Sequence, residues 1–350
     1  MTADAAGGVW TYALDLAQSL RDRGIHTTIA VMGPAPSAAQ LADAQGLDLR
    51  AGNFKLEWMD DPWREVDQAG DWLRALEQEI RPDVVHLNGY AHGSVRFSAP
   101  KLVVAHSCVL SWWTAVHGEA APDSWNEYRK RVGAGLAAAD FVVAPSRAML
   151  QAIHLNYGTL CRSDVIPNGR APRLFRSGPK EPFVLTAGRF WDRAKNLETL
   201  DRAAAKLDWP VYAAGEARSA ESIRCLGPLS AGELRHWFAR ASIYALPARY
   251  EPFGLSILEA ALSGCALVLG DIPSLRENWD GAAVFVPPDD VHGLVEQIRL
   301  LARHEDVRRG FQQAARKRAV NFSLDRMTDA YLERYAALRC LSQPAAVFRS

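Results

Sequence analysis

The feature of this sequence that most constrains its fold is an alternation of short apolar segments with segments of helical periodicity. Apolar runs that end in Gly, Asn, Ser or Pro are typical of strands buried on both faces of a parallel sheet. The first series of such runs covers residues 25–33, 83–89, 101–107, 140–146 and 164–169. Helical patterns accompany it over 9–24, 65–80 and 124–139. The alternation predicts βαβ units and an α/β fold.

The alternation begins again after a turn-rich stretch, NGRAPRLFRSGPKEP, at residues 168–182. The second series of predicted strands covers 183–190, 210–216, 242–248, 265–271 and 282–288. Ser230 with Glu233, and Ser274 with Glu277, have the spacing of capping boxes, which predicts that a helix starts at each. A second α/β half therefore follows the first.

We predict two doubly wound domains that face a cleft, with ligands bound at the carboxyl ends of the strands. The N-terminal Rossmann-like domain covers residues 1–170, and the C-terminal one covers 181–322. An amphipathic helix over 323–342 is expected to pack back toward the N-terminal domain.

The N-terminal domain lacks room for a complete first strand. Residues 1–6, MTADAA, precede Gly7, and three extended residues span about 10 Å, roughly half of a typical strand. We expect a truncated strand that leaves neighbouring backbone groups unpaired at the centre of the sheet. We also expect the natural protein to begin upstream of Met1, with apolar residues that complete this strand.

Composition narrows the classes of function. The chain has a formal net charge of zero, which argues against a broad nucleic-acid surface. The five cysteines show no CxxC or Cys/His ligand spacing and are typical of thiols in a reducing compartment. No apolar run approaches the ~20 residues of a membrane span, and no signal peptide is recognisable. We therefore expect a cytoplasmic protein that does not bind nucleic acid.

Two carboxylates, Glu251 and Glu259, flank a Pro-Phe-Gly turn between the predicted strand 242–248 and a helix over 255–264. Gly254 lets the backbone approach a ligand closely, and the free N–H groups of the first helical turn suit an anion. The two acids are therefore expected to hold two parts of one extended ligand whose phosphates lie between them. If Glu251 and Glu259 are considered alone, helix capping and solvation of the carboxylates would also explain them.

Two cations strengthen the anion-site interpretation. The segment AGRFWDRAKN places Arg189 and Lys195 at the carboxyl end of another predicted strand. Together with a helix N-terminus, they can neutralise a diphosphate without a metal. D-x-D, a metal-holding signature of the other main class of sugar-nucleotide transferases, does not occur in the sequence. We expect neither a metal nor a cofactor.

The segment EPFGLSILE strongly resembles the E-x7-E motif of the retaining glycosyltransferases of family 4, which have the GT-B fold. The resemblance extends over nearly the whole chain: Gly7–Gly8, DVVHLNG, VVAHS, VIPNG, AGR…KN, SGCALVLGDIP, VFVPPDD and the terminal helix. It implies a metal-independent, hexosyltransferase-type enzyme. Such an enzyme moves a sugar from a nucleotide-diphosphate sugar to a hydroxyl, with retention of configuration. The acceptor would be a saccharide, a lipid-linked glycan or a small molecule.

The resemblance also implies roles for individual residues. Glu251 would contact hydroxyls of the donor sugar, and Glu259 would bind the ribose of the nucleotide. Arg189 and Lys195 would hold the diphosphate and stabilise its charge as it departs. His106 would lie beside the donor sugar on the N-terminal side of the cleft. The remaining donor contacts would come from Gly8, Phe253, Gly254 and Leu255.

Other interpretations stay open at several positions. His106 could be a hydrogen-bonded histidine at a sheet edge, and His86 is expected to be structural. The pair Trp112–Trp113 fits an acceptor pocket, a membrane contact or core packing. The run 129–131, Arg-Lys-Arg, is expected to be a solvated helix face, with weak peripheral membrane contact as the alternative.

Two rival functions also remain. A GT-B-like epimerase or phosphorylase would use the same donor site for different chemistry. A catalytically inactive nucleotide-sugar-binding protein would bind the donor without turnover.

Overall fold

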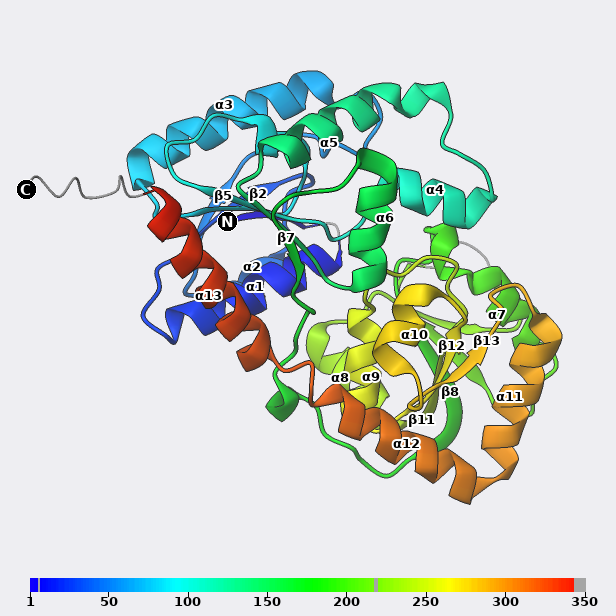
Figure 1. Ribbon diagram of the computed structural model, residues 1–350. Helices are drawn as coiled ribbons and strands as arrows, with labels where there is room; N and C mark the ends of the chain where they lie inside the picture. Colours follow the sequence, from blue (N-terminus) through cyan, green and yellow to red (C-terminus); the bar gives the residue numbers. More distant parts are fainter. Residues whose placement is uncertain (6, 217–219, 343–350) are drawn as a thin grey trace, which may run out of the picture. The chain divides into compact units, whose positions relative to one another are not determined.

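The computed structural model describes residues 1–5, 7–216 and 220–342 and divides into two compact units (Figure 1). Unit 1 contains Met1–Ser111, Ala120–Pro167 and the described residues from Asp325 onward. Unit 2 contains Trp112–Glu119 and Asn168–Leu324. Every strand pairing within their sheets is parallel, so both units are α/β.

The strands of unit 1 form two parallel sheets. One has the order β1-β2-β3 and the other the order β4-β5-β6-β7. The strands are β1 (Thr2–Asp4), β2 (Thr28–Met32), β3 (Asp48–Ala51), β4 (Val85–Leu87), β5 (Lys101–Val104), β6 (Phe141–Ala144) and β7 (Ser163–Val165). The helices of residues 1–167 are α1 (Gly8–Arg21), α2 (Ala38–Asp43), α3 (Trp63–Ile80), α4 (Val109–His117), α5 (Asn126–Ala138) and α6 (Arg147–Tyr157). From Trp112 onward, α4 belongs to unit 2. Residues 1–167 also contain two short 3₁₀ helices, η1 (Ala91–Ser94) and η2 (Asp123–Trp125).

The short first strand is joined to β4 by side chains. All three residues of β1 pair with Ala30–Met32 of β2. On the other side, Asn88 donates its backbone N–H to Thr2 Oγ1 (2.8 Å) and its Nδ2 to the Thr2 carbonyl (2.6 Å). These two hydrogen bonds of Asn88, rather than a backbone ladder, connect β1 to the chain just after β4.

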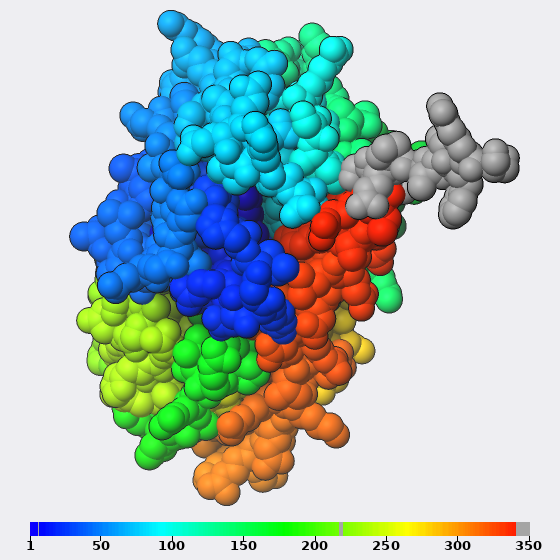
Figure 2. All heavy atoms as spheres, turned by 90° about the vertical axis from the view of Figure 1, so that its left-hand side faces the viewer, coloured from blue at the N-terminus to red at the C-terminus, as the bar shows by residue number. Residues whose placement is uncertain are grey.

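The C-terminal helix α13 (Leu324–Ser342) packs along α1, as both views show (Figures 1 and 2). The Thr328 hydroxyl donates to Ser19 Oγ at 2.9 Å in a buried contact. Arg23 forms ion pairs with Asp325 (3.1 Å) and Asp329 (3.2 Å). These contacts make α13 part of unit 1 from Asp325 onward.

Unit 2 contains one six-stranded parallel sheet with the order β10-β9-β8-β11-β12-β13. Its strands are β8 (Glu181–Ala187), β9 (Val211–Ala214), β10 (Arg224–Gly227), β11 (Ala241–Leu246), β12 (Ala266–Gly270) and β13 (Val284–Val286). Its helices are α7 (Leu197–Ala204), α8 (Ala231–Arg240), α9 (Leu255–Leu262), α10 (Pro273–Trp279), α11 (Val291–Arg303) and α12 (Glu305–Ala319), with the 3₁₀ helices η3 (Pro172–Leu174) and η4 (Arg193–Lys195). The strand order is that of a Rossmann fold.

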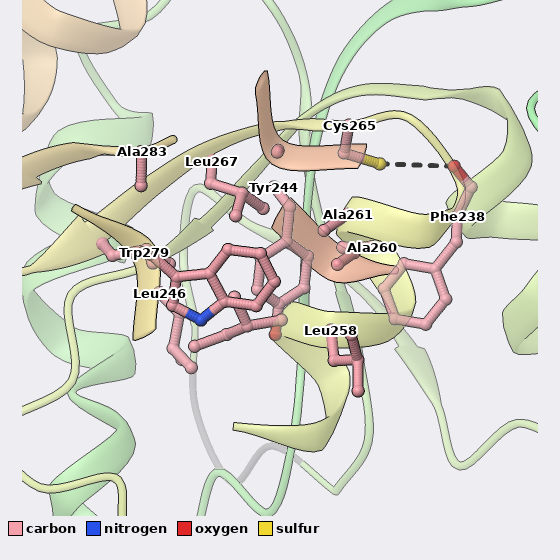
Figure 3. Close-up of a cluster of buried hydrophobic side chains, with 14 of the residues drawn as sticks. Phe238, Tyr244, Leu246, Leu258, Ala260, Ala261, Cys265, Leu267, Trp279 and Ala283 are labelled. Carbon is pink, nitrogen blue, oxygen red and sulfur yellow. Dashed lines mark hydrogen bonds between the residues drawn. The ribbon is translucent and has the colours of Figure 1, made fainter. Parts of the chain in front are cut away.

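A dense apolar cluster anchors α9 on this sheet (Figure 3). Leu258 of α9 is fully buried with Tyr244 of β11 and Trp279 of α10. The Cys265 thiol, just before β12, donates to the Phe238 carbonyl at 3.3 Å. Close packing of these side chains restricts the movement of α9, the helix that carries Glu259.

The structure confirms most predicted elements and corrects some. The capping box of Ser230 and Glu233 is present, but Ser274 does not cap a helix. Pro273 occupies the first turn of α10, so the helix begins before Ser274 can act as a cap. The edge strands β3 and β10 and the helix α2 lack apolar runs, and sequence periodicity did not predict them. No helix in the described residues is both long and apolar enough to cross a membrane.

Candidate functional site

The strand order of unit 2 reverses between β8 and β11, which are neighbours in the sheet. The β8 connection runs toward β9 on one side, and the β11 connection runs toward β12 on the other. The loops after these two strands therefore diverge and leave room for a ligand at the carboxyl ends. These are the loops that carry Arg189, Lys195 and Glu251.

Lys195 and Glu251 form an ion pair at this switch point. Lys195 Nζ lies 2.5 Å from Glu251 Oε2, and the side chains are 15% and 13% exposed. The aliphatic part of Lys195 passes Gly188, where an added Cβ would lie 3.8 Å from Lys195 Cδ. Arg189, at the start of the same loop, places its guanidinium 5.2 Å from the centre of the Trp191 ring. Two loops far apart in the sequence thus bring opposite charges together.

Backbone and side-chain hydrogen bonds hold the Lys195 loop. Asp192 Oδ1 accepts from the Ala194 N–H (2.9 Å) and from the Trp112 indole N–H (2.8 Å). The Arg249 N–H donates to the Ala194 carbonyl at 2.8 Å, and its guanidinium donates to Asp289 Oδ1. These bonds preorganise the Lys195 ammonium, which makes it a better electrostatic stabiliser than a mobile lysine would be.

Asn196 connects the loops that follow β8, β11 and β13. Its backbone is left-handed, with a φ of 55°, and its side chain is buried. Asn196 Nδ2 donates to the Pro247 carbonyl at 2.9 Å and to the Pro288 carbonyl at 2.6 Å. Asparagine suits this position because it tolerates the left-handed region and carries the required donors.

We expect Asn196→Ala to lower the free energy of unfolding by about 2–4 kcal/mol, because one buried and one partly buried carbonyl lose their donor and alanine is strained at positive φ. Asn196→Gly removes the amide but tolerates the backbone, so it should cost about 1 kcal/mol less than the alanine variant. Urea unfolding of both variants measures the difference. Equal stability of wild type and Asn196→Gly would show that the amide contributes nothing.

The E-P-F-G turn positions the start of α9. Gly254 is left-handed (φ 91°), and an added Cβ would lie 2.6 Å from Ile257 Cδ1, so only glycine fits. Phe253 is buried and packs edge-on against Phe322 at 5.5 Å between ring centres. Leu255, the first residue of α9, is partly buried. The Ser274 hydroxyl, predicted to cap a helix, instead donates to the Glu251 carbonyl at 2.5 Å.

Glu259 is buried and forms an ion pair with Arg170, a residue that sequence reasoning did not single out. Arg170 Nε lies 2.9 Å from Glu259 Oε1, with the side chains 7% and 11% exposed. The backbone of Arg170 bonds to Phe322 and Leu324, with its N–H donating to the Phe322 carbonyl at 3.1 Å. The available signal is an arginine directly after VIPNG, within the turn-rich stretch 168–182.

In unit 1, His106 follows β5 and is partly exposed. Its Nε2 lies 2.9 Å from Asn88 Oδ1, and burial of part of the ring lowers the pKa of His106. The imidazole is therefore neutral at physiological pH. His86 is buried and hydrogen-bonded to Asn88 and Tyr335. Gly8 is the exposed first residue of α1.

The remaining candidates have protein partners. Trp113 stacks on His117 at 4.4 Å between ring centres, while Trp112 bonds to Asp192. Arg131 pairs with Asp67 and with Glu127 on its own helix. Among residues 1–5, 7–216 and 220–342, no group of three or more His, Cys, Asp or Glu side chains is placed to hold a metal ion.

Comparison with protein families gives two matches. The family described as Glycosyltransferase Family 4 matches residues 6–173, and the family described as Glycosyl transferases group 1 matches residues 181–304. Among curated proteins, a glycogen synthase of Mycobacterium tuberculosis is 28% identical over 311 residues, which cover 76% of this chain and 72% of the relative.

Solved structures show the same architecture. Sucrose-phosphate synthase from Thermosynechococcus elongatus has a TM-score of 0.80 at 18% identity, over 97% of this chain and 96% of its own. Anabaena HepE in complex with UDP-glucose has a TM-score of 0.76 at 17% identity, over 96% of this chain and 100% of its own. With the switch-point geometry, these findings confirm the predicted fold and family. The chain is a glycosyltransferase of the family 4 type with the GT-B fold.

Proposed function

We propose that the protein transfers a sugar from a nucleotide-diphosphate sugar to an acceptor hydroxyl, with retention at the anomeric carbon and without a metal ion. The observation that carries the proposal is the Lys195–Glu251 ion pair at the switch point of unit 2, with Arg189 on the same loop as Lys195. The complex of HepE with UDP-glucose supports a nucleotide-sugar donor. The absence of D-x-D from the sequence supports cationic side chains in the role of a metal.

In this proposal the Lys195–Glu251 pair opens when the donor binds. The diphosphate competes for the Lys195 ammonium, and the released Glu251 carboxylate accepts hydrogen bonds from the donor sugar. The bond from the anomeric carbon to the diphosphate oxygen breaks, and its electron pair leaves on that oxygen, stabilised by Arg189 and Lys195. The acceptor oxygen bonds to the anomeric carbon on the same face. Its proton passes to the departing phosphate oxygen, so no side chain acts as a nucleophile.

The nucleotide end of the donor is assigned to Glu259. Its carboxylate keeps accepting capacity beyond the bond to Arg170, because an ionised carboxylate has about four lone-pair positions. The Arg170 guanidinium offsets the charge of the buried carboxylate and orients it toward the ribose hydroxyls. Backbone groups at Phe253, Gly254 and Leu255 are proposed to line the phosphates and sugar.

Substitutions of Glu259 and Glu251 are expected to have different effects on nucleotide binding and on turnover. Glu259→Gln should weaken binding of the free nucleoside diphosphate by about 1.5–3 kcal/mol, the value of hydrogen bonds to a charged group. Glu251→Gln should not weaken that binding, and should strengthen it where the diphosphate no longer competes with Glu251 for Lys195. Glu251→Gln should lower turnover, because Glu251 contacts the sugar. Isothermal titration calorimetry with UDP, ADP and GDP measures the first effect, and the exposed Glu198→Gln on α7 is the matched control. Equal losses of nucleotide affinity in both variants would contradict the division of roles.

A transfer assay tests the whole proposal. Labelled UDP-, ADP- and GDP-sugars are offered with saccharide, lipid-linked and small-molecule acceptors, with and without EDTA, and NMR reads the anomeric configuration of the product. Retention of configuration in EDTA supports the proposal. Phosphate-dependent sugar phosphate release would indicate a phosphorylase, altered donor stereochemistry an epimerase, and donor binding without turnover an inactive binding protein.

A further inference from the structure

A polar network in unit 1 surrounds Asn88, in the loop after β4. Asn88 Oδ1 lies 2.9 Å from Nε2 of His106 and 3.1 Å from Nε2 of His86. Asn88 Nδ2 lies 2.6 Å from the carbonyl of Thr2. One amide therefore contacts two imidazoles and one backbone group.

The Thr2 carbonyl determines which way the Asn88 amide faces. A carbonyl oxygen can only accept, so the amide nitrogen must point toward Thr2. The amide oxygen then faces both imidazoles, and it too can only accept. Hence each of the two Nε2 atoms, in His86 and in His106, must carry a proton and donate it to Asn88.

The opposite nitrogens of the two rings differ in their surroundings. His86 Nδ1 accepts a hydrogen bond from the Tyr335 hydroxyl of α13 at 2.6 Å. His106 Nδ1 has no hydrogen bond to any residue that the structure describes, and His106 is partly exposed. A neutral ring protonated at Nε2 has a lone pair at Nδ1. His106 Nδ1 can therefore accept a hydrogen bond, and no described residue donates one to it.

We propose that Asn88 is a positioning residue that fixes His86 and His106 as Nε2–H tautomers, so that His106 Nδ1 accepts a hydrogen bond from a hydroxyl of a substrate sugar. The inference rests on the proposed glycosyl transfer, because it names a sugar hydroxyl as the donor. A phosphate oxygen cannot fill this role, since it also only accepts. His106 thus discriminates the sugar from the diphosphate.

The groups that face the network carry no positive charge at neutral pH. They are the hydroxyls of Tyr12, Tyr331 and Tyr335. Burial raises the pKa of Tyr12 well above its usual value. The carboxamide of Asn88 is uncharged, so it orients the imidazoles without favouring their protonation.

The tautomers can be observed directly in the full chain. Protein labelled with ¹⁵N-histidine is examined by long-range ¹H–¹⁵N correlation NMR, and His106→Gln and His86→Gln assign the two rings. Both rings are expected to be protonated at Nε2 and unprotonated at Nδ1. A proton on Nδ1 of His106 would overturn the proposal. This measurement needs no ligand, so it stands even if the transfer assay fails.

Binding and kinetics locate the hydroxyl. His106→Gln retains a donor toward Asn88 but has no acceptor at the Nδ1 position, whereas His106→Asn places an oxygen there. If the hydroxyl belongs to the donor sugar, His106→Gln should weaken UDP-glucose binding about tenfold, leave UDP binding within about twofold, and be rescued by His106→Asn. If it belongs to the acceptor, the acceptor KM rises by a similar factor instead. No change in either quantity would contradict the role of His106.

Asn88→Asp tests the positioning role itself. A carboxylate beside the two imidazoles raises their pKa values, so His106 becomes protonated at Nδ1 and loses its lone pair. Activity requires the neutral ring. The Asn88→Asp protein should therefore be active above the raised pKa of His106 and inactive below it. The acidic limb of the pH–rate profile should move up by more than about one unit relative to wild type. Asn88→Ala should lower activity without that movement. An unmoved limb in a folded Asn88→Asp protein would show that Asn88 is only structural.

Discussion

Lys195→Ala and Arg189→Ala are each expected to lower kcat by about 10²–10³-fold, the effect of removing one preorganised charge-stabilising donor. The Lys195 ammonium is held beside Glu251 by a loop whose backbone is bonded to Asp192 and Arg249. Its charge is therefore in place before the leaving group develops its own. Initial rates at saturating donor measure the loss.

Two exposed cations of α7 and its C-terminal end provide matched controls. Lys206→Ala and Arg202→Ala remove the same charge from unit 2 and should leave kcat within about twofold. Because Lys195→Ala also leaves Glu251 without its lysine, the unfolding transition is measured in parallel. Near-normal turnover in both site variants, or turnover that fully depends on added Mg²⁺, would contradict the role given to these cations.

Arg170→Met is expected to lower the free energy of unfolding by about 3–5 kcal/mol, the cost of leaving one partner of a buried ion pair without the other. Glu259 and Arg170 are both nearly enclosed, so water cannot take over the role of the guanidinium. Urea unfolding followed by circular dichroism measures the change. Nucleoside diphosphate affinity should fall as well, because the orientation of the Glu259 carboxylate is lost.

A double-mutant cycle isolates the pair. Arg170→Met combined with Glu259→Gln should be less destabilising than the sum of the two single changes, because neither charge is then left alone. Arg309 and Glu305 form a comparable pair at 2.6 Å, but their side chains are 68% and 60% exposed. Arg309→Met should therefore cost less than about 1 kcal/mol. If Arg170→Met lowers the free energy of unfolding by a similarly small amount, burial of the pair does not make its disruption more destabilising.

Sequence periodicity was sufficient to predict the strands that are buried on both faces, because each appears as an apolar run ending in turn residues. It also predicted that Lys195 and Glu251 belong to loops at the carboxyl ends of two strands. In the structure, Lys195 Nζ lies 2.5 Å from Glu251 Oε2. It could not predict β3 and β10, whose exposed edges permit polar residues.

The residues that sequence reasoning missed act through contacts between distant parts of the chain. Arg170 has no motif of its own, and its importance comes from the approach of Glu259. Asn88 appears in the sequence as the end of an apolar run, and its role depends on Thr2 and His106. Ser274 was misassigned because a capping-box spacing ignores the preceding proline, which starts the helix earlier.

The Arg170–Glu259 pair has a practical consequence for dissecting the protein. A fragment spanning 181–322, chosen from strand and helix limits, would contain Glu259 but discard the arginine that neutralises it. A fragment spanning 168–324 would retain Arg170 together with Phe322 and Leu324, whose backbones hold it in place. Expression of the donor-binding half by itself should therefore use the wider limits, since the narrower ones remove the counter-ion of a buried acid.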